Sequence, residues 1–278
     1  MPSTTTRIAF IGGGNMARSL IAGLVADGYE AARLTVSDPD TAKRDALAEQ
    51  FGITACAETV AAVDAAEVIV LCVKPQVAAV ACREVGALLS EPLPLVISVM
   101  AGVTEASIHG WLGQPTPLVR SMPNTPMLVQ SGAIGLHASA GTWARHVNLA
   151  EEVMRAGGLT HWVKTEAELD TVTALSGSGP AYFFLFMEAL EEAAIAEGLD
   201  PEGARLLSIQ TALGAARMAV ESDESPQQLR QRVTSPGGTT ERAIAVFEKG
   251  GLPALTLRAV AAARHRAQEL SELIAEEK

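Results

Sequence analysis

The sequence predicts an α/β domain with a mostly parallel sheet, followed by an all-helical second domain. Up to residue 163, short apolar runs typical of buried strands alternate with amphipathic segments of helical period. From Glu166 onward, helical segments follow one another directly. A chain of 278 residues with 48% hydrophobic content is also long enough to form two domains. We therefore expect domains over residues 1–163 and 164–278.

The first strand-like run leads into a glycine-rich turn that reads Gly12-Gly13-Gly14-Asn15-Met16-Ala17. Gly12, Gly14 and Ala17 occupy the three small positions of the G-x-G-x-x-G/A fingerprint, and an amphipathic segment follows. Backbone N–H groups at such a helix start can face a pyrophosphate. Glycine-rich turns also occur for purely structural reasons, but the strand before and the helix after favour a Rossmann-type dinucleotide site.

The rest of the first domain continues this alternation. Further strands are expected at residues 34–37, 68–73, 95–99, 118–121, 133–136 and 160–163, and helices at residues 16–25, 41–51, 57–66, 76–89 and 144–156. The run 68–73 is apolar throughout, as in a parallel strand that helices cover on both faces. Ligands of such sheets bind beyond the carboxyl ends of the strands, so Lys74-Pro75 and Ala101-Gly102 should lie beside a cofactor. A solvated lysine at a strand end explains Lys74 equally well.

The end of the second expected strand gives conflicting signals about the cofactor. Asp38 is placed to accept a hydrogen bond from the ribose 2′-hydroxyl of NAD, whereas Ser37, Lys43 and Arg44 could together receive the 2′-phosphate of NADP. A turn in which Asp38 caps the following helix explains this residue as well. The sequence leaves these alternatives open.

Composition argues against several classes of protein. The chain has 32 acidic against 21 basic residues, a formal charge of −11, and no long basic run, so nucleic acid is not expected as a partner. No signal peptide and no apolar run of about 18 residues is found, so we expect a cytoplasmic protein without membrane contact. Cys56, Cys72 and Cys82 and the five scattered histidines show no ligand spacing, so no metal site is expected.

The second domain is expected to consist of helices alone, at residues 166–175, 181–197, 204–220, 226–233, 241–249 and 253–276. Residues 181–187 are apolar on every side of the helix, which predicts burial within a larger assembly. A second glycine loop, Ser235 to Thr240, directly precedes a helix and has the glycines and hydroxyls that suit a carboxylate or phosphate. A structural loop in which Thr239 caps the helix is equally consistent.

Five segments then carry a specific resemblance. They are Gly12-Gly13-Gly14-Asn15-Met16-Ala17, Val73-Lys74-Pro75, Met122-Pro123-Asn124-Thr125-Pro126, Leu175-Ser176-Gly177-Ser178-Gly179-Pro180-Ala181-Tyr182 and Val233-Thr234-Ser235-Pro236-Gly237-Gly238-Thr239-Thr240. The first is shared with many dehydrogenases, whereas the last two together are highly specific. Through these segments, which span nearly the whole chain, the sequence resembles the pyrroline-5-carboxylate reductases.

The resemblance implies a Rossmann domain, a helical domain that interleaves with a second subunit, and an active site at the interface of a homodimer, often within a decamer. The implied reaction is the reduction of the ring C=N of L-1-pyrroline-5-carboxylate to L-proline, the last step of proline biosynthesis. The implied hydride donor is NADPH, or less often NADH. Because an iminium already accepts hydride readily, little acid–base machinery is expected.

The resemblance also implies residue roles. Gly12, Gly14, Asn15 and Met16 would hold the cofactor pyrophosphate, Ser37 the adenine ribose or its phosphate, and Val73, Lys74, Pro75, Ala101 and Gly102 would flank the nicotinamide. Ser235, Gly237, Gly238, Thr239 and Thr240 would bind the substrate, with N–H groups of Gly238 and Thr239 on its carboxylate and Thr240 Oγ as the catalytic group on the ring nitrogen. Glu166 matches an acidic position near the product.

Departures from the family pattern at Asp38-Pro39 and Thr59 concern the adenosine end, so they bear on the choice between NADPH and NADH. Two other functions are compatible with parts of the sequence. A 3-hydroxyacid or ketoacid reductase would need a Lys or His acid, for which Lys74 is the sole candidate. A regulator that senses NADPH without turnover would have no need of the second glycine loop. The reductase interpretation accounts for both loops.

Overall fold

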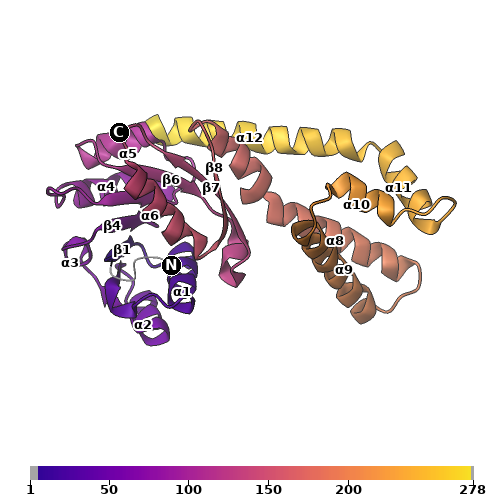
Figure 1. Cartoon of the computed structure of the whole chain (residues 1–278), viewed down its shortest axis with the longest axis horizontal. Helices are drawn as coiled ribbons and strands as arrows, with labels where there is room; N and C mark the ends of the chain where they lie inside the picture. The colour runs from indigo at the N-terminus through magenta and orange to yellow at the C-terminus, as the bar shows by residue number, and fades with distance from the viewer. Residues whose placement is uncertain (1–5, 277–278) are drawn as a thin grey trace. The chain divides into compact units, whose positions relative to one another are not determined.

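The computed structural model describes residues 6–276, and the chain forms two compact units. The sheet unit comprises the described parts of Met1–Ser178 and Ala262–Lys278, and the helical unit is Gly179–Ala261. Figure 1 traces the chain through both. The helical unit is therefore an excursion of the chain between two segments that belong to the sheet unit.

Within the described residues, the sheet unit holds one eight-stranded sheet in the order β3-β2-β1-β4-β5-β6-β7-β8. The strands are β1 (Ile8–Ile11), β2 (Leu34–Ser37), β3 (Thr54–Cys56), β4 (Val68–Leu71), β5 (Leu95–Ser98), β6 (Leu118–Met122), β7 (Gly132–Ala138) and β8 (Gly158–Trp162). Every neighbouring pair is parallel except β6 and β7. The strand order reverses around β1, which places a crevice at its carboxyl end. The predicted, mostly parallel α/β sheet is confirmed.

Helices cover both faces of this sheet (Figure 1). They are α1 (Asn15–Ala26), α2 (Thr41–Phe51), α3 (Thr59–Val63), α4 (Ala78–Gly86), α5 (Glu105–Leu112), α6 (Ala144–Arg155) and α7 (Glu168–Val172), with 3-10 turns at Ala31–Arg33, Pro75–Val77 and Thr125–Val129. Ile8 and Phe10 of β1 belong to a buried cluster with α1, α2 and α6, whereas Ala9 and Ile11 belong to a second cluster with α3, α4 and α5. Because both faces are covered, β1, β4 and β5 are buried at every position, which explains their uninterrupted apolar runs.

Two elements of the sheet unit have no counterpart among the predicted ones. Strand β3 has three residues, lies at the edge of the sheet and has no fully buried residue, so it carries no apolar run. Helix α5 is short and contains Gly110, a poor helix former. It does begin with a cap, since Thr104 Oγ1 accepts a hydrogen bond from the Ser107 N–H at 3.2 Å. That threonine was the available signal.

The helical unit consists of α8 (Gly179–Ala196), α9 (Pro201–Glu221), α10 (Pro226–Arg232), α11 (Thr239–Lys249) and the first part of α12 (Leu252–Glu276). Local sequence sets these boundaries. Asp200 caps α9 by accepting from the Gly203 N–H at 2.9 Å, with Pro201 in the first turn. Ser225 and Gln228 form a capping box at the start of α10. The all-helical second half is confirmed.

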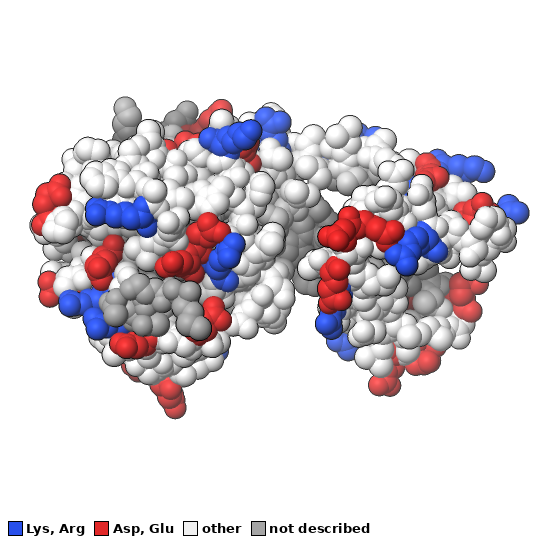
Figure 2. Space-filling model, in the orientation of Figure 1, with Lys and Arg blue, Asp and Glu red and all other residues white. Residues whose placement is uncertain are grey.

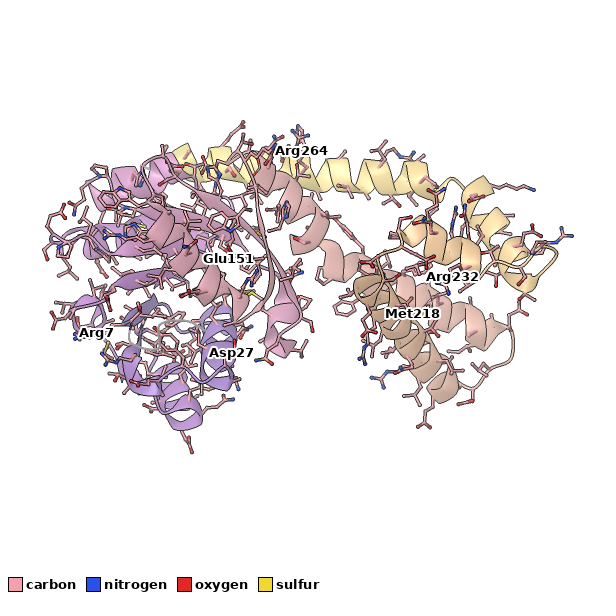
Figure 3. All side chains as sticks on the ribbon, in the orientation of Figure 1. Arg7, Asp27, Glu151, Met218, Arg232 and Arg264 are labelled. Carbon is pink, nitrogen blue, oxygen red and sulfur yellow. The ribbon has the colours of Figure 1, made fainter. Side chains whose placement is uncertain are left out.

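Almost no side chain of the helical unit is buried within the single chain. Among its residues only Gly179 and Ala204 are buried. Large apolar side chains are exposed on several helices: Phe183, Phe184, Leu185, Leu206, Leu207, Met218, Val220, Val246 and Leu257. Met218 of α9 is labelled in Figure 3. Apolar surface of this extent requires a covering partner, in line with the predicted burial of residues 181–187.

The contacts divide the chain at residue 178 rather than at residue 163. Helix α7 packs against β6 and β7, which keeps it in the sheet unit. The end of α12 also belongs there, since Ile274 packs against the buried cluster that contains α4 and α5. The boundary at residue 163 was expected from the change from strands to helices along the sequence. The division at residue 178 is set by which segments contact one another, which is a different criterion. The expected domain boundary therefore stays a prediction.

Two glycines provide a matched test of helix packing in the sheet unit. A Cβ on Gly23 of α1 would lie 1.9 Å from the Ala156 carbonyl oxygen, whereas a Cβ on Gly110 of α5 would meet nothing within 4 Å. We expect Gly23→Ala to lower the free energy of unfolding by about 1–3 kcal/mol through overpacking. Gly110→Ala should raise it by roughly 0.5–1 kcal/mol through helix propensity. Urea unfolding followed by circular dichroism measures both, and equal effects of one sign would contradict this packing.

Candidate active site

The glycine-rich turn after β1 packs against the carboxyl end of β4. Gly12 has φ +99°, and a Cβ on it would lie 3.0 Å from the backbone C and O atoms of Cys72. Its N–H donates to the Ser37 carbonyl at 2.7 Å, which fixes the turn to β2 on the other side. Glycine is therefore required here both by the backbone conformation and by the space available.

The next two residues complete the turn and open α1. The Gly13 N–H donates to Asp38 Oδ2 at 2.8 Å. Gly14 is the N-cap residue of α1, has no side-chain cap, and a Cβ on it would meet nothing within 4 Å. Asn15 and Met16, the first residues of α1, follow beside this open space. An uncapped helix start next to open space suits an anion such as a pyrophosphate.

A cavity of about 770 Å³ opens over this turn. It is lined by, among others, Gly12, Gly14, Ser37, Asp38, Lys43, Thr59, Val73, Lys74, Gln76 and Glu84. Its volume lies within the ordinary range for ligand and cofactor sites. The structure thus brings together Gly12, Gly14, Ser37, Val73 and Lys74, five of the residues predicted to bind the cofactor, at the carboxyl ends of β1, β2 and β4.

A smaller cavity of about 160 Å³ adjoins the first, since Gln76 lines both. It contains Pro75, Ala101 and Gly102, the other residues predicted to flank the nicotinamide. Gly102 has φ +75°, and Ile274 Cδ1 of α12 would lie 3.3 Å from a Cβ placed on it. The two cavities are therefore neighbours along the carboxyl ends of β1, β2, β4, β5 and β6.

Two charged side chains, Arg120 and Asp170, line the smaller cavity, and Glu166 is the ion-pair partner of Arg120. Arg120, in the middle of β6, is 9% exposed and donates to Glu166 Oε1 at 2.6 Å. The same oxygen accepts from the Glu105 N–H at the start of α5, also at 2.6 Å. Asp170 lines the cavity, and burial raises the pKa of its carboxyl, although Arg120 and Arg264 act against this rise. Glu166 therefore ties α5 to β6 within the sheet unit.

Asn124 joins two of the sequence motifs. Its Nδ2 donates to the Ser176 carbonyl at 2.9 Å, and its Oδ1 accepts from the Ala133 N–H at 2.9 Å. The chain at residues 173–177 forms a π-turn, in which the Ser178 N–H donates to the Thr173 carbonyl at 2.8 Å. The sequence analysis used the segment around Asn124 only as one of the family motifs and missed this buried amide.

Sequence reasoning also missed Arg120, Asp170 and Gln76 as parts of the site. An arginine within an otherwise apolar strand was a signal for Arg120, because a buried guanidinium needs a carboxylate partner. No comparable signal existed for Asp170 and Gln76. Their place in the cavities depends on how α7 and the turn after β4 pack.

The second glycine loop lies in the helical unit. Gly237 has φ +74°, and its N–H donates to Glu241 Oε2 at 2.8 Å. The Gly238 N–H donates to the Ser235 carbonyl at 3.0 Å, so this group is already engaged within the loop. Gly238, and not Thr239, is the N-cap residue of α11, which has no side-chain cap. The interpretation of Thr239 as the helix cap is therefore wrong, and Thr239 and Thr240 begin α11.

The described residues contain no group of three or more His, Cys, Asp or Glu that could hold a metal ion. Desolvation raises the pKa of the Cys56, Cys72 and Cys82 thiols, to about 12 for Cys82, which is fully buried, whereas Cys56 and Cys72 are partly exposed. Acidic and basic side chains are interspersed on the face shown in Figure 2. Among the described residues, no helix is long and apolar enough to cross a membrane.

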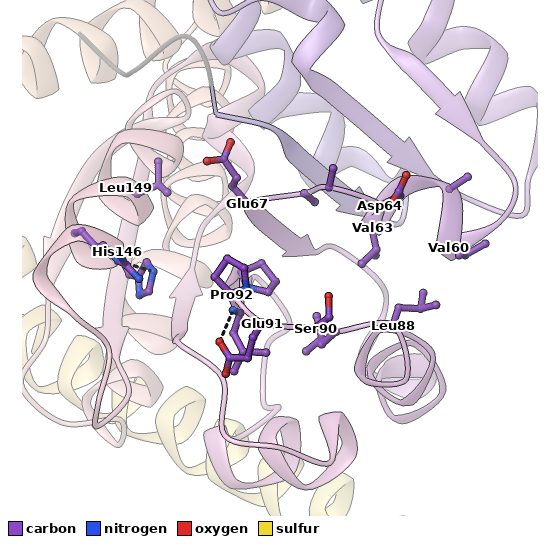
Figure 4. A pocket seen from close by; sticks show the side chains of 17 residues that line it. Val60, Val63, Asp64, Glu67, Leu88, Ser90, Glu91, Pro92, His146 and Leu149 are labelled. Atoms are coloured by element: carbon purple, nitrogen blue, oxygen red, sulfur yellow. Dashed lines mark hydrogen bonds between the residues drawn. The ribbon is translucent and has the colours of Figure 1, made fainter.

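A third cavity, of about 740 Å³, lies at the opposite edge of the sheet (Figure 4). Its lining includes Val60, Glu67, Leu88, Glu91 and His146, and none of the predicted site residues. Burial lowers the pKa of His146, assisted by the neighbouring Arg145. This cavity lies before the amino ends of β4 and β5, whereas ligands of such sheets bind beyond the carboxyl ends, although Val60 and Leu88 line both it and the larger cavity over the glycine turn.

Comparison with known proteins supports one family. Residues 166–270 match the family model for pyrroline-5-carboxylate reductase dimerisation, and residues 7–102 match that for NADP oxidoreductase, coenzyme F420-dependent. A pyrroline-5-carboxylate reductase of Pseudomonas aeruginosa is 48% identical over 269 residues, covering 97% of this chain and 98% of its own.

Two solved structures agree with this result. A pyrroline-5-carboxylate reductase from Coxiella burnetii superposes with a TM-score of 0.93 at 50% identity, covering 96% of this chain and 98% of that one. The Plasmodium falciparum pyrroline carboxylate reductase, solved with NADP bound, gives 0.83 at 27% identity and covers 96% and 99% of the two chains. Identity and coverage of this extent show that the chain belongs to the pyrroline-5-carboxylate reductase family.

Proposed function

We propose that this chain reduces the ring C=N of L-1-pyrroline-5-carboxylate to give L-proline, with NADPH as the preferred hydride donor. The observation that carries the proposal is the pair of neighbouring cavities at the carboxyl ends of the strands, the larger beside Gly12 and Gly14 and the smaller beside Ala101 and Gly102. Family membership and the NADP bound by the Plasmodium relative support the same cofactor.

In this proposal the larger cavity takes the adenosine and pyrophosphate of the cofactor. The N–H groups of Asn15 and Met16, beside the open space at Gly14, donate to the pyrophosphate. Ser37 lies at the adenosine ribose, and Val73, Lys74, Pro75, Ala101 and Gly102 enclose the nicotinamide. When bound, NADPH supplies the hydride, and the chain supplies its orientation and a site from which water is excluded.

The second glycine loop is proposed to bind the substrate. The start of α11 offers the N–H groups of Thr239 and Thr240 to the substrate carboxylate, because the N–H of Gly238 is already bonded to Ser235. Gly237 gives the loop its left-handed turn. Glu166 remains a predicted substrate neighbour, with one oxygen engaged by Arg120 and Glu105.

In this proposal one side chain, that of Thr240, contacts the reacting C=N group directly. A hydrogen bond from Thr240 Oγ to the nitrogen of the neutral imine draws electron density from the C=N bond and favours hydride addition at carbon, while one proton from solvent passes to the nitrogen to complete the amine of L-proline. The remaining acceleration comes from holding the two reactants in register, which is an effect of position and electrostatics. This agrees with cavities that contain no histidine.

The helical unit is proposed to form a homodimer with its counterpart in a second chain, because its apolar side chains are exposed and residues 166–270 match the dimerisation model. Further assembly into a decamer and a cytoplasmic location, both expected from the sequence and the resemblance, stay predictions.

The reaction is tested by following loss of NADPH or NADH absorbance after addition of pyrroline-5-carboxylate, against a panel of 2-keto and 3-keto acids. We expect turnover of the cyclic imine alone, with higher kcat/KM for NADPH. Absence of turnover with either nucleotide would refute the proposal, and turnover of a keto acid would favour a ketoacid reductase.

Thr240 gives a more specific test. Thr240→Ala should lower kcat on the order of 10²-fold, because one hydrogen-bond donor to the reacting group is lost. The KM for NADPH should change little. Thr240→Ser, which keeps the hydroxyl, should recover most of the rate. Weakened NADPH binding with a normal kcat in Thr240→Ala would exclude this role.

The interface is tested by Phe184→Asp, which places a carboxylate on an exposed apolar side of α8. Burying that charge in a dimer contact costs several kcal/mol, so we expect a monomer by light scattering at concentrations where the natural chain is a dimer. Asn148→Asp adds the same charge at an exposed position of α6 and should leave the dimer intact. An unchanged mass for Phe184→Asp would place the interface elsewhere.

A further inference from the structure

We propose that Asp38 is a positioning residue of the cofactor site, which holds the glycine turn through the Gly13 N–H, and that it does not read the ribose 2′-hydroxyl. The sequence left three roles open for this residue, namely ribose acceptor, helix cap and turn residue. The inference rests on the cofactor site proposed above and concerns the way in which that site is shaped.

Asp38 directs its two carboxylate oxygens to two different backbone segments. Oδ2 accepts from the Gly13 N–H at 2.8 Å, and Oδ1 accepts from the Asp40 N–H at 2.9 Å. The residue is 6% exposed, and its charge is balanced by Lys43, whose Nζ lies 3.8 Å from Oδ1. A buried carboxylate with a backbone donor on each oxygen is held in place, because turning it toward a ribose would leave the buried Gly13 N–H without a partner.

The helix-cap role belongs to another residue. Asp40, not Asp38, is the N-cap of α2, and its Oδ1 accepts from the Ala42 and Lys43 N–H groups at 3.0 and 3.3 Å. On this side, the backbone N–H that donates to the Asp38 carboxylate is that of Asp40, which precedes the helix, and the contact with Lys43 of α2 is an ion pair at 3.8 Å. Its longer-range bond, across 25 residues to Gly13, is the one that no local turn requires.

This bond determines which N–H groups face the pyrophosphate. The Gly12 N–H is turned back to Ser37 and the Gly13 N–H to Asp38, so two consecutive donors point at the end of β2. The chain then enters α1, where the first turn is uncapped and lies beside open space at Gly14. By holding the Gly13 N–H, Asp38 fixes the course of the backbone through the turn. The N–H groups at the start of α1 are then the ones that face the anion.

The arrangement also reconciles an acidic residue at this position with a 2′-phosphate. The carboxylate is already neutralised by two N–H groups and Lys43, whereas the Lys43 side chain is 50% exposed at the cavity. Arg44 is engaged elsewhere, since its Nη1 donates to the Asp38 carbonyl at 2.7 Å and its Nη2 to Thr41 Oγ1 at 3.0 Å. Lys43 lies 3.8 Å from both Asp38 Oδ1 and Asp40 Oδ2, but its ammonium makes no shorter contact with either, so it can also approach a phosphate on the ribose.

The test compares both nucleotides in Asp38→Asn, which keeps the size of the side chain but replaces one acceptor oxygen by an amide NH₂. We expect the KM for NADPH and the KM for NADH to rise together by about tenfold, as for loss of a charge-assisted hydrogen bond. We expect kcat at saturation to stay within about twofold, because the bond acts on cofactor binding and not on the reacting atoms.

A cofactor fragment separates the two roles further. 2′-AMP carries the adenosine and the 2′-phosphate but no pyrophosphate, so its inhibition constant against NADPH should not change in Asp38→Asn. Lys43→Met serves as the matched variant, because it should weaken 2′-AMP and NADPH and leave NADH unaffected. Asp40→Asn, which alters the cap of α2 without contacting Gly13, controls for disturbance of this segment.

Three outcomes would overturn the proposal. A higher KM for NADH alone, or tighter binding of 2′-AMP, would make Asp38 the ribose reader, and unchanged KM values for both nucleotides would remove any role in cofactor binding. If Asp38→Asn does not fold, as judged by thermal melting, Asp38→Ser allows the same comparison with a single acceptor. Failure of the natural chain to oxidise either nucleotide would refute the proposed function and not this inference.

Discussion

The close approach of Gly12 to the backbone of Cys72 is the constraint on which the rest of the site depends. It holds the turn after β1 against the end of β4, while the bonds to Ser37 and Asp38 hold the same turn against the end of β2. Because β1 lies between these two strands, one turn touches the carboxyl ends of three. As a result, the uncapped start of α1 faces the cavity.

The sequence predicted those parts of the fold whose signals are local and repeated. Uninterrupted apolar runs identified β1, β4 and β5, because strands covered on both faces contain no polar alternation. Elements without such a signature, β3 and α5, were missed. Within the site, the glycines were predictable from their motif, whereas the bonds of Asp38, Arg120 and Asn124 join segments far apart in the chain and depend on tertiary packing.

Both glycine loops leave the start of a helix uncapped and available to an anion, but different acceptors hold their glycine N–H groups. In the first, both glycine N–H groups are directed to acceptors on β2, and the helix start is left for an anion. In the second, the N–H of Gly237 is held by Glu241 and that of Gly238 by Ser235, again leaving the first turn of a helix uncapped. Glycine therefore contributes shape in both loops, and the helix termini contribute the charge complementarity.

The return of α12 to the sheet unit bears on how the protein is made. Ile274, at the end of the chain, packs against the cluster that contains α4 and α5 and lines the smaller cavity together with Gly102. During synthesis, the strands and helices of the first 178 residues emerge from the ribosome well before this contact can form. One wall of the cavity thus comes from a late segment, so a nascent chain can form the nucleotide-binding turn before it completes the neighbouring pocket.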